Sequence, residues 1–431
     1  MEFSEGYRPR YADDEIERLM KSFGAVWVKG PKYCGKTRTA SEHSSSIFAL
    51  DDSENNYGNY RLATIDPSIA LQGEEPHLID EWQLVMPIWD LVRRSVDSDN
   101  RPGRFILSGS STPEADGGNA DGPPLHSGFG RITSIRMRTM SLYESGDSDG
   151  KASLKDLFNG ELKNSVATKR NLDWIIDMVM CGGWPGNLPL SVDERITAVS
   201  RYPEDICEVD LPRVDPSKSP SRMKRVMRSL ARNESTMASM STLARDIKEY
   251  DDDVIKDSTV SKYIDTLDRM GLIADQPAFN PNLRSSVRVG KSPKRHLTDP
   301  ALAAACLRAT KNTLRNDLNT LGFLFESLCE RDLQIYAHAN GGNLYHYRDS
   351  TGREIDAVVE IPGEGWGAFK IKLGTDRIDE AAENLIRIDR MIRKDDNAKA
   401  PKFLCIISGL ESACYRRPDG VYVVPIGSLK A

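Results

Sequence analysis

Short apolar runs alternate with helical patterns over roughly the first 144 residues, and they lie at residues 25–28, 77–79 and 105–107. Runs of this length, separated by stretches of helical period, are typical of a parallel sheet covered by helices. The stretch at 111–130 is rich in Gly, Pro, Asp and Ser and has no apolar period, so we expect a long loop there. The first third of the chain is therefore predicted to be an α/β domain.

Helical periods dominate residues 153–298, apart from a Gly-Gly-Trp-Pro break at 182–185. Two apolar stripes follow one another in this region, and their members are Leu243, Ile247 and Ile255, then Val260, Ile264 and Leu267. A short strand-like run comes after the second stripe. This order of helix, turn, helix and strand resembles a winged-helix module.

The last part of the chain, from about residue 314, combines a helical stretch at 321–336 with strand-like runs. The runs lie at 343–347, 354–360, 367–373, 403–407 and 421–425, a pattern that predicts a small mixed α/β domain. A chain of 431 residues is too long for one hydrophobic core. We therefore expect three domains, at residues 1–150, 151–310 and 311–431.

The composition, with 39% hydrophobic and 28% charged residues, is that of a folded globular protein. A net charge of −6 argues against nucleic-acid binding by the whole surface, although a local basic stripe can still contact phosphates. The chain has no apolar run of the roughly 18 residues that a membrane helix needs, and its first residues contain no apolar signal-peptide core. We therefore expect a cytoplasmic protein without a membrane partner. The cysteines are scattered and form no CxxC pair, which favours neither a disulfide framework nor a zinc site.

The segment GPKYCGKT matches all positions of the Walker A phosphate-binding pattern. Gly30 and Gly35 allow the backbone to curl so that its N–H groups point at a β-phosphate, and Lys36 brings a positive charge toward the β and γ oxygens. An apolar run precedes the segment and a helix-compatible stretch follows it, which is the expected order of strand, loop and helix. We expect ATP to bind to the segment Gly30, Pro31, Lys32, Tyr33, Cys34, Gly35, Lys36, Thr37 and Arg38.

A second motif, HLIDEWQ at residues 77–83, ends a short apolar strand with two carboxylates. Asp80 would hold Mg²⁺ together with the hydroxyl of Thr37, and Glu81 would polarise the attacking water. An Asp-Glu pair alone is common, but its position downstream of the Walker A pattern makes a Walker B assignment specific. The predicted cofactors are therefore ATP and Mg²⁺, and the predicted reaction is ATP hydrolysis with Lys36 and Glu81 as catalytic residues.

Further polar side chains follow the third apolar run, in FILSGSS at 105–111. Ser108 or Ser110 is a candidate sensor of the γ-phosphate, because open α/β sheets place their ligands at the carboxyl ends of strands. Ordinary strand-end serines explain the pattern equally well. Among three later arginines, Arg131, Arg136 and Arg138, we prefer Arg131 as an arginine finger, in cis or across a subunit interface. A solvated or structural arginine is the alternative.

Together, these motifs resemble the prokaryotic AAA-type P-loop ATPases that carry a C-terminal domain of unknown function. The matching segments span nearly the whole chain, and they are YRPRY, GPKYCGKT, LIDEWQ, FILSGSSTP, GFGRI, MSLYESG, GGWP, SLARN, RHLTDPALAAA and GFLFESLCERDLQIY. The resemblance implies an ATP-binding AAA-like domain at the N-terminus. It implies far less about a cellular role.

The C-terminal region also resembles the PD-(D/E)xK nucleases, whose fold is a restriction-endonuclease-like α/β domain. Such a site needs a helix carboxylate, an Asp at a strand end and an acid two positions before a Lys, so that oxygens gather Mg²⁺. Glu326, Asp356 and Lys372 match, but Lys370 occupies the acidic position. Because a cation there repels a divalent metal, we expect a degenerate, non-cleaving domain. Residual nuclease activity and an unrelated structural sheet are the alternatives.

Basic residues flank the predicted winged-helix module and are candidate contacts for DNA phosphates. They are Lys224, Arg225, Arg228 and Arg232 before it, and Arg284, Arg288, Lys291, Lys294 and Arg295 after it. A solvated charged face with interleaved acidic residues is the competing interpretation.

Three functions follow from these patterns. The first is a Mg-dependent ATPase that couples nucleotide binding and hydrolysis to domain movement, with DNA or a protein as the partner. The second is a nucleotide-gated DNA- or protein-binding regulator with little hydrolysis. The third, an ATP-dependent nuclease, is disfavoured by Lys370. The sequence leaves the oligomeric state open, although an arginine supplied by a neighbouring copy would require an oligomer.

Overall fold

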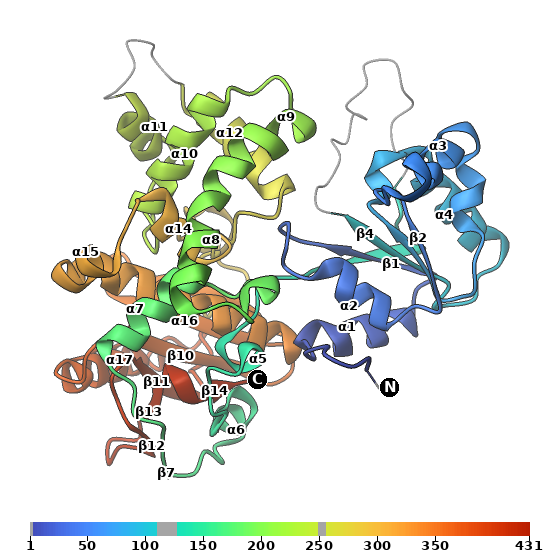
Figure 1. The fold of residues 1–431 in the computed structure, drawn as a ribbon. Coiled ribbons are helices and arrows are strands. Elements are labelled where there is room, and N and C mark those ends of the chain that lie inside the picture. Colours follow the sequence, from blue (N-terminus) through green and yellow to red (C-terminus); the bar gives the residue numbers. More distant parts are fainter. Residues whose placement is uncertain (1–2, 110–126, 249–255) are drawn as a thin grey trace. The chain divides into compact units, whose positions relative to one another are not determined.

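The chain forms two compact units in a computed structural model, which describes residues 3–109, 127–248 and 256–431 (Figure 1). Unit 1 contains residues 1–139 and two short later segments, 184–186 and 266–272. Unit 2 contains residues 140–183, 187–265 and 273–431. Ser110, Ile255 and most of the predicted loop at 111–130 lie outside the described residues.

Unit 1 is built on a parallel five-stranded sheet in the order β2-β3-β4-β1-β5. Its strands are β1 (Ala25–Lys29), β2 (Ser46–Ala49), β3 (His77–Asp80), β4 (Phe105–Gly109) and β5 (Ile132–Arg136). Its helices are α1 (Tyr11–Met20), α2 (Lys36–Glu42), α3 (Gly58–Ile65) and α4 (Pro87–Ser98), with 3-10 turns η1 (Glu54–Asn56), η2 (Pro67–Leu71) and η3 (Trp82–Leu84). The predicted parallel sheet with helices is confirmed, and the three apolar runs form β1, β3 and β4.

The central strand β1 is apolar on both faces because helices cover both. Ala25 and Trp27 point into a core shared with α4, whereas Val26 and Val28 point into a core shared with α1 and α2. In the first core, the ring of Trp82 packs against that of Trp27 with 5.5 Å between centroids. This packing fixes the chain directly after β3.

Unit 2 contains most of the helices that the structure describes, and Ser or Asn side chains cap several of them. The helices are α5 (Leu142–Ser145), α6 (Leu154–Asn159), α7 (Leu172–Cys181), α8 (Val192–Asp205), η5 (Ile206–Asp210), α9 (Leu211–Val214), α10 (Pro220–Arg232), α11 (Met240–Lys248), α12 (Asp257–Arg269), α13 (Val287–Gly290), α14 (Pro300–Cys306), α15 (Lys311–Asn316), α16 (Leu318–Ala339) and α17 (Ile378–Ile392). The last residues of α12 belong to unit 1. Among the described helices of the whole chain, none is long and apolar enough to cross a membrane.

The C-terminal half of unit 2 contains a mixed seven-stranded sheet in the order β7-β12-β13-β11-β10-β9-β8. Its strands are β7 (Ser165–Val166), β8 (Asn343–Arg348), β9 (Glu354–Ile361), β10 (Gly365–Lys372), β11 (Phe403–Ser408), β12 (Ala413–Arg416) and β13 (Tyr422–Pro425). β11 pairs in parallel with β10 and β13, and the other pairs are antiparallel. The predicted mixed α/β region is therefore confirmed, although the predicted boundaries of the three domains stay a prediction.

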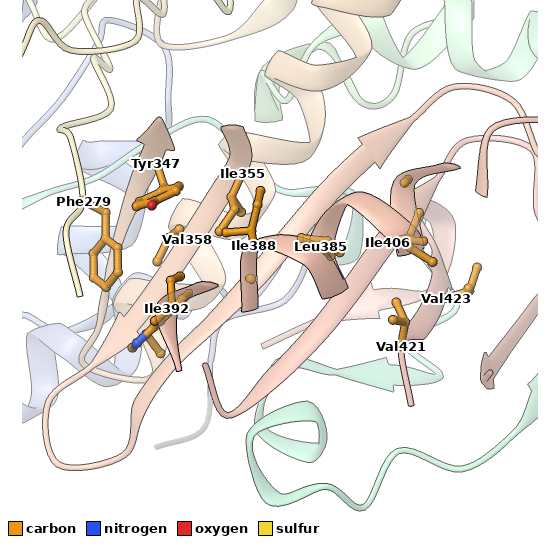
Figure 2. Close-up of a cluster of buried hydrophobic side chains, with 14 of the residues drawn as sticks. Phe279, Tyr347, Ile355, Val358, Leu385, Ile388, Ile392, Ile406, Val421 and Val423 are labelled. Carbon is orange, nitrogen blue, oxygen red and sulfur yellow. The ribbon is translucent and has the colours of Figure 1, made fainter. Parts of the chain in front are cut away.

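One buried core of unit 2 lies between α17 and this sheet (Figure 2). Leu385, Ile388 and Ile392 recur at helical spacing along α17, so one face of the helix is apolar and packs on the strands. Opposite them lie Ile406 of β11 and Val423 of β13. A separate short pair, β6 (Ala152–Ser153) with β14 (Leu429–Lys430), joins the start of the unit to its end.

The stretch predicted to form a winged-helix module contains α11 and α12. The strand-like run after α12 forms isolated antiparallel bridges, Ile273 with Leu297 and Gln276 with Lys294, and not a named strand. The winged-helix assignment stays a prediction.

Candidate functional site

The phosphate-binding pattern occupies the turn between β1 and α2 in unit 1. Gly35 caps α2 with φ 97°, a left-handed conformation that costs a residue with a Cβ roughly 1–2 kcal/mol. A Cβ on Gly30 would lie 2.2 Å from the backbone oxygen of Met137. The backbone therefore requires both glycines of the pattern, Gly35 for its conformation and Gly30 for space.

Lys36 and Thr37 begin α2 and lie next to the second motif. Lys36 is buried, and its Nζ donates to the carbonyl oxygen of Pro31 across the loop at 2.9 Å. The hydroxyl of Thr37 donates to Oδ1 of Asp80 at 3.1 Å. An ammonium group, a hydroxyl and a carboxylate thus meet at one edge of the sheet.

Strand register explains why these distant residues meet. Asp80 of β3 pairs with Ser108 of β4, and Ser108 pairs in turn with Val28 of β1. Because the three strands are parallel, their carboxyl ends lie at the same edge, where open α/β sheets place their ligands. The fully buried hydroxyl of Ser108 donates to Oδ1 of Asp80, the same atom that accepts from Thr37. Ser108 therefore holds the Asp80 carboxylate in place.

Glu81 follows β3 in a left-handed backbone conformation, with φ 52° and ψ 40°. Its carboxylate accepts a hydrogen bond from the side-chain amide of Gln83. The next residue, Trp82, is almost fully buried among aromatic rings. A strained backbone held by neighbouring packing is common at functional sites, so this geometry marks Glu81 as a candidate.

Burial raises the pKa of both carboxyl groups of the second motif, Asp80 and Glu81. The positive charge of Lys36 opposes this shift in both groups. Asp51, which follows β2 at the same edge, adds a negative charge that raises both pKa values further. Asp51 was not among the predicted site residues, although the apolar run IFAL directly before it is a signal that could have found it.

Arg10 is a second residue that the sequence analysis missed, although its motif YRPRY was noted. Its side chain is buried, and one Nη donates to the carbonyl oxygen of Cys34 in the phosphate loop at 3.0 Å. The other Nη donates to the carbonyl oxygen of Arg138 at 2.9 Å. Arg10 therefore ties the loop to the chain that follows β5. Local sequence carries no signal for this contact, since the three residues are far apart in the chain.

The remaining residues of the predicted nucleotide segment differ in exposure. Cys34 is buried, whereas the side chain of Tyr33 is 67% exposed and has φ 64°. The ammonium of Lys32 lies 5.5 Å from the centre of the Tyr33 ring. Arg38 pairs with Glu42 of the same helix at 3.2 Å. The role of these four residues in nucleotide binding stays a prediction.

Arg131, predicted as an arginine finger, lies far from the phosphate loop in the sheet. β5 runs parallel to β1 with Ala25 opposite Ile132, so Arg131 is at the amino end of β1, whereas the loop follows its carboxyl end. There its Nε donates to Asp97 at 2.6 Å. In this arrangement Arg131 does not reach the phosphate loop, and its predicted role as an arginine finger, in cis or across a subunit interface, stays a prediction.

The two other arginines lie at the carboxyl end of β5. Arg136 pairs with Asp268 at 2.9 Å. Arg138 is buried, which lowers the pKa of its guanidinium to about 9. Both are closer in the sheet to the phosphate loop than Arg131 is.

The nuclease-like residues of the C-terminal region are brought together in unit 2, but with lysines among them. Asp356 accepts a hydrogen bond from Nζ of Lys370 at 2.6 Å. Glu326 pairs with Lys294, a residue that the sequence analysis had assigned to a DNA-binding cluster. Lys372 ends β10 and borders a pocket of about 290 Å³ that Lys370 also lines.

Several basic residues proposed for DNA contacts are already paired with acidic side chains. Arg288 makes hydrogen bonds of 2.9 and 3.0 Å to the two oxygens of Glu360. Arg295 is buried and pairs with Asp275, and Lys294 is buried as well. The predicted basic surface after α12 thus loses three of its members.

Three family models match successive parts of the chain. Residues 22–145 match a family model described as an AAA domain, and residues 172–313 and 321–429 match two domains of unknown function, DUF8612 and DUF4143. Uncharacterized proteins of Mycobacterium bovis and Mycobacterium tuberculosis are each 25% identical over 365 residues, which cover 84% of this chain and 73% of the relative.

Two solved structures show a distant likeness. A Walker-type ATPase of Pyrococcus abyssi matches with a TM-score of 0.43 and 11% identity over 70% of this chain and 97% of its own. The ORC2 protein of Aeropyrum pernix, solved as ADPNP–ADP complexes, matches with a TM-score of 0.33 and 13% identity over 74% of this chain and 98% of its own. By its family matches, the chain carries an AAA-type P-loop domain near its N-terminus, followed by two domains of unknown function.

Proposed function

We propose that unit 1 binds ATP with Mg²⁺ and hydrolyses it. The observation that carries this proposal is the contact of Thr37 with Asp80 at 3.1 Å, beside Lys36 and Glu81. Two motifs separated by some forty positions thereby form one polar group at the carboxyl edge of a parallel sheet. This is the edge at which such sheets bind ligands.

The side chains at this edge fit a magnesium ion. Mg²⁺ prefers hydroxyl, carboxylate and phosphate oxygens, and Thr37 and Asp80 offer the first two kinds within hydrogen-bonding distance of each other. Ser108 supports the orientation of Asp80. When bound, the ion would neutralise negative charge on the β- and γ-phosphates.

The remaining roles follow from charge and position. Lys36 would place its ammonium against the phosphate oxygens after leaving the carbonyl of Pro31. Glu81, with its pKa raised by burial, would accept the proton of the attacking water. A general base is most effective when its pKa approaches the working pH, so the raised pKa supports this role.

The competing function is a nucleotide-gated regulator with little hydrolysis. A regulator of this kind would bind ATP and Mg²⁺ with the same side chains, but Glu81 would not accept a proton from water. What turnover would drive, including movement of unit 2 or action on DNA, stays a prediction.

The proposal is tested by measuring phosphate release from ATP in the presence of Mg²⁺, together with the affinity of the protein for ATP. Lys36→Ala should weaken ATP binding and abolish turnover, because a cation facing the phosphates is lost. Glu81→Gln should leave ATP binding within about threefold and lower turnover by roughly a hundredfold or more, because it removes only the base. Glu74→Gln, an exposed carboxyl in the same unit, is the matched control and should behave like the wild type.

The wild type should be assayed over a range of protein concentrations, with and without duplex DNA. Turnover per chain that rises with concentration would indicate an arginine supplied by a neighbouring copy, and stimulation by DNA would identify the partner. Tight ATP binding without turnover in the wild type would sink the ATPase proposal in favour of the regulator.

A further inference from the structure

A group of buried charged side chains occupies the nuclease-like site of unit 2. Glu326 and Glu330 come from α16, Asp356 from β9 and Lys370 from β10. Lys294 and His296 lie on the segment between α13 and α14, and His296 pairs with Glu330 at 3.0 Å. The most exposed of these side chains, Glu326, is only 19% exposed.

The ammonium of Lys294 lies at the centre of the acidic side chains. It donates to Glu326, to Oε1 of Glu330 at 2.6 Å and to the backbone oxygen of Asp356 at 3.2 Å. A lysine ammonium has three donors, so these three oxygens satisfy it. Two of its acceptors come from the helix and one from the strand. This is also how an oxygen-bound metal ion would be surrounded.

The carboxylate of Asp356 is occupied on both oxygens. Oδ1 accepts from Nζ of Lys370 at 2.6 Å, and Oδ2 accepts from the backbone N–H of Ile371 at 2.8 Å. A divalent ion binding there would have to displace the Lys370 ammonium and would lie near two buried positive charges. The residues present therefore do not fit a divalent metal.

We propose that the ammonium of Lys294 takes the place of the divalent ion in this nuclease-like site, and that removing it turns the site into a divalent-cation site. With Lys294 present, the buried carboxylates are balanced without metal, so unit 2 folds and functions metal-free. Without Lys294, Asp356 keeps Lys370 and Glu330 keeps His296, whereas Glu326 loses its cation. A buried carboxylate without a cation destabilises the fold, so the oxygens of Glu326 and Glu330 would then favour a replacement ion. A pocket of about 220 Å³, lined by Lys294, Glu326 and Asp356, gives an ion access.

The test measures binding of Mn²⁺ to nucleotide-free, full-length protein by the loss of the free-ion paramagnetic resonance signal. Lys294→Gln keeps the side chain's approximate size and its capacity to donate hydrogen bonds, but removes the charge. It should bind one Mn²⁺ at least about tenfold more tightly than the wild type does, and Mn²⁺ should raise its thermal unfolding midpoint. Lys291→Gln is the matched control, since it removes the same charge from an exposed lysine that donates to the carbonyl of Arg348.

Two results would overturn the proposal. One is a folded Lys294→Gln protein that binds Mn²⁺ no better than the Lys291→Gln control. The other can be observed without a folded Lys294 variant. If the wild type binds Mn²⁺ and Glu326→Gln abolishes this binding, a metal site already exists beside Lys294. If Lys294→Gln folds only when Mn²⁺ is present, the proposal is supported.

Discussion

Single residues beside the phosphate loop act by holding their neighbours. Arg10 binds the carbonyl oxygen of Cys34, and Ser108 binds Asp80. Gln83 donates to Glu81, and Gly109 leaves room for it, because a Cβ there would lie 2.2 Å from Oε1 of Gln83. The geometry of the proposed base therefore depends on a neighbouring side chain, Gln83.

Replacing Gln83 with Ala should lower the rate of ATP hydrolysis more than it weakens ATP binding. The hydrogen bond to a carboxylate contributes roughly 1.5–3 kcal/mol, so a loss of about tenfold to a hundredfold in kcat is expected. Steady-state kinetics, with ATP affinity measured separately, will check this. Gln72→Ala is the control, because it removes an exposed amide of the same unit. An unchanged kcat would show that Gln83 does not position Glu81.

Site residues that belong to short sequence motifs could be proposed from the sequence. Lys36, Thr37, Asp80 and Glu81 belong to two short motifs, and the fold brings these motifs together at one sheet edge. Arg10 could not be assigned a role in this way, because it reaches the loop only through the packing of unit 1. The position of Arg131 relative to the loop could not be predicted either, because it depends on the direction of β5, which no local pattern encodes.

The placement of Lys294 shows the same limit for charge. Along the chain it stands among basic residues and indicates a surface for phosphates. In the fold it is buried against Glu326 and Glu330, which lie more than thirty positions away. Basic residues that are close together in the sequence therefore do not show that a surface is positively charged.

At the scale of elements, α17 shows how one helix face holds the C-terminal sheet. Leu385 is fully buried at the centre of that face (Figure 2). The helix begins with two acidic residues, Asp379 and Glu380, which suit its amino end. The apolar face and the acidic first turn both favour α17 in this position.

Leu385→Ala should lower the free energy of unfolding of unit 2 by about 2–5 kcal/mol, because it removes buried methyl groups and leaves a cavity. Arg387→Ala, an exposed change on the same helix, should stay within about 0.5 kcal/mol of the wild type. Denaturant unfolding followed by fluorescence will measure both. ATP binding by unit 1 is expected to be unchanged below the unfolding transition, and an effect of Leu385→Ala no larger than that of Arg387→Ala would contradict the assigned packing.

Elements with long apolar runs were predicted well, and short or mixed elements were not. β1, β3 and β4 are buried on both faces and therefore read as continuous apolar runs. β2 and β5 are only partly buried, and the sequence of β5, ITSIR, mixes polar with apolar residues. Two-residue strands such as β7 carry no signal at all, since tertiary pairing alone defines them.

At the scale of the whole molecule, unit 2 buries a second group of charged side chains next to Lys294. His296 lies 3.0 Å from both Glu234 and Glu330, and all three side chains are buried. Burial alone would lower the pKa of His296, but the two carboxylates raise it to about 10. In the unfolded chain the pKa of a histidine is about 6.5.

The stability of unit 2 should therefore fall as the pH rises. A raised pKa in the folded state gives a contribution that is complete below about pH 6.5 and is lost progressively as the pH approaches 10. The His296→Gln variant lacks this contribution. Its thermal unfolding midpoint should therefore fall less steeply between these pH values than that of the wild type. Thermal unfolding at several pH values, with wild type and variant compared, will check this, and parallel curves would rule out His296 as the source.

The two ends of unit 2 are joined by strands, and this has a consequence for how the protein is made. The backbone N–H of Arg416 reaches Asn164 across 252 positions, next to the pairing of β7 with β12. A ribosome adding about 5–20 residues per second needs roughly ten seconds to a minute to cover that distance. During that interval the nascent β7 has no partner strand, and its length of two residues leaves little edge for another chain to capture.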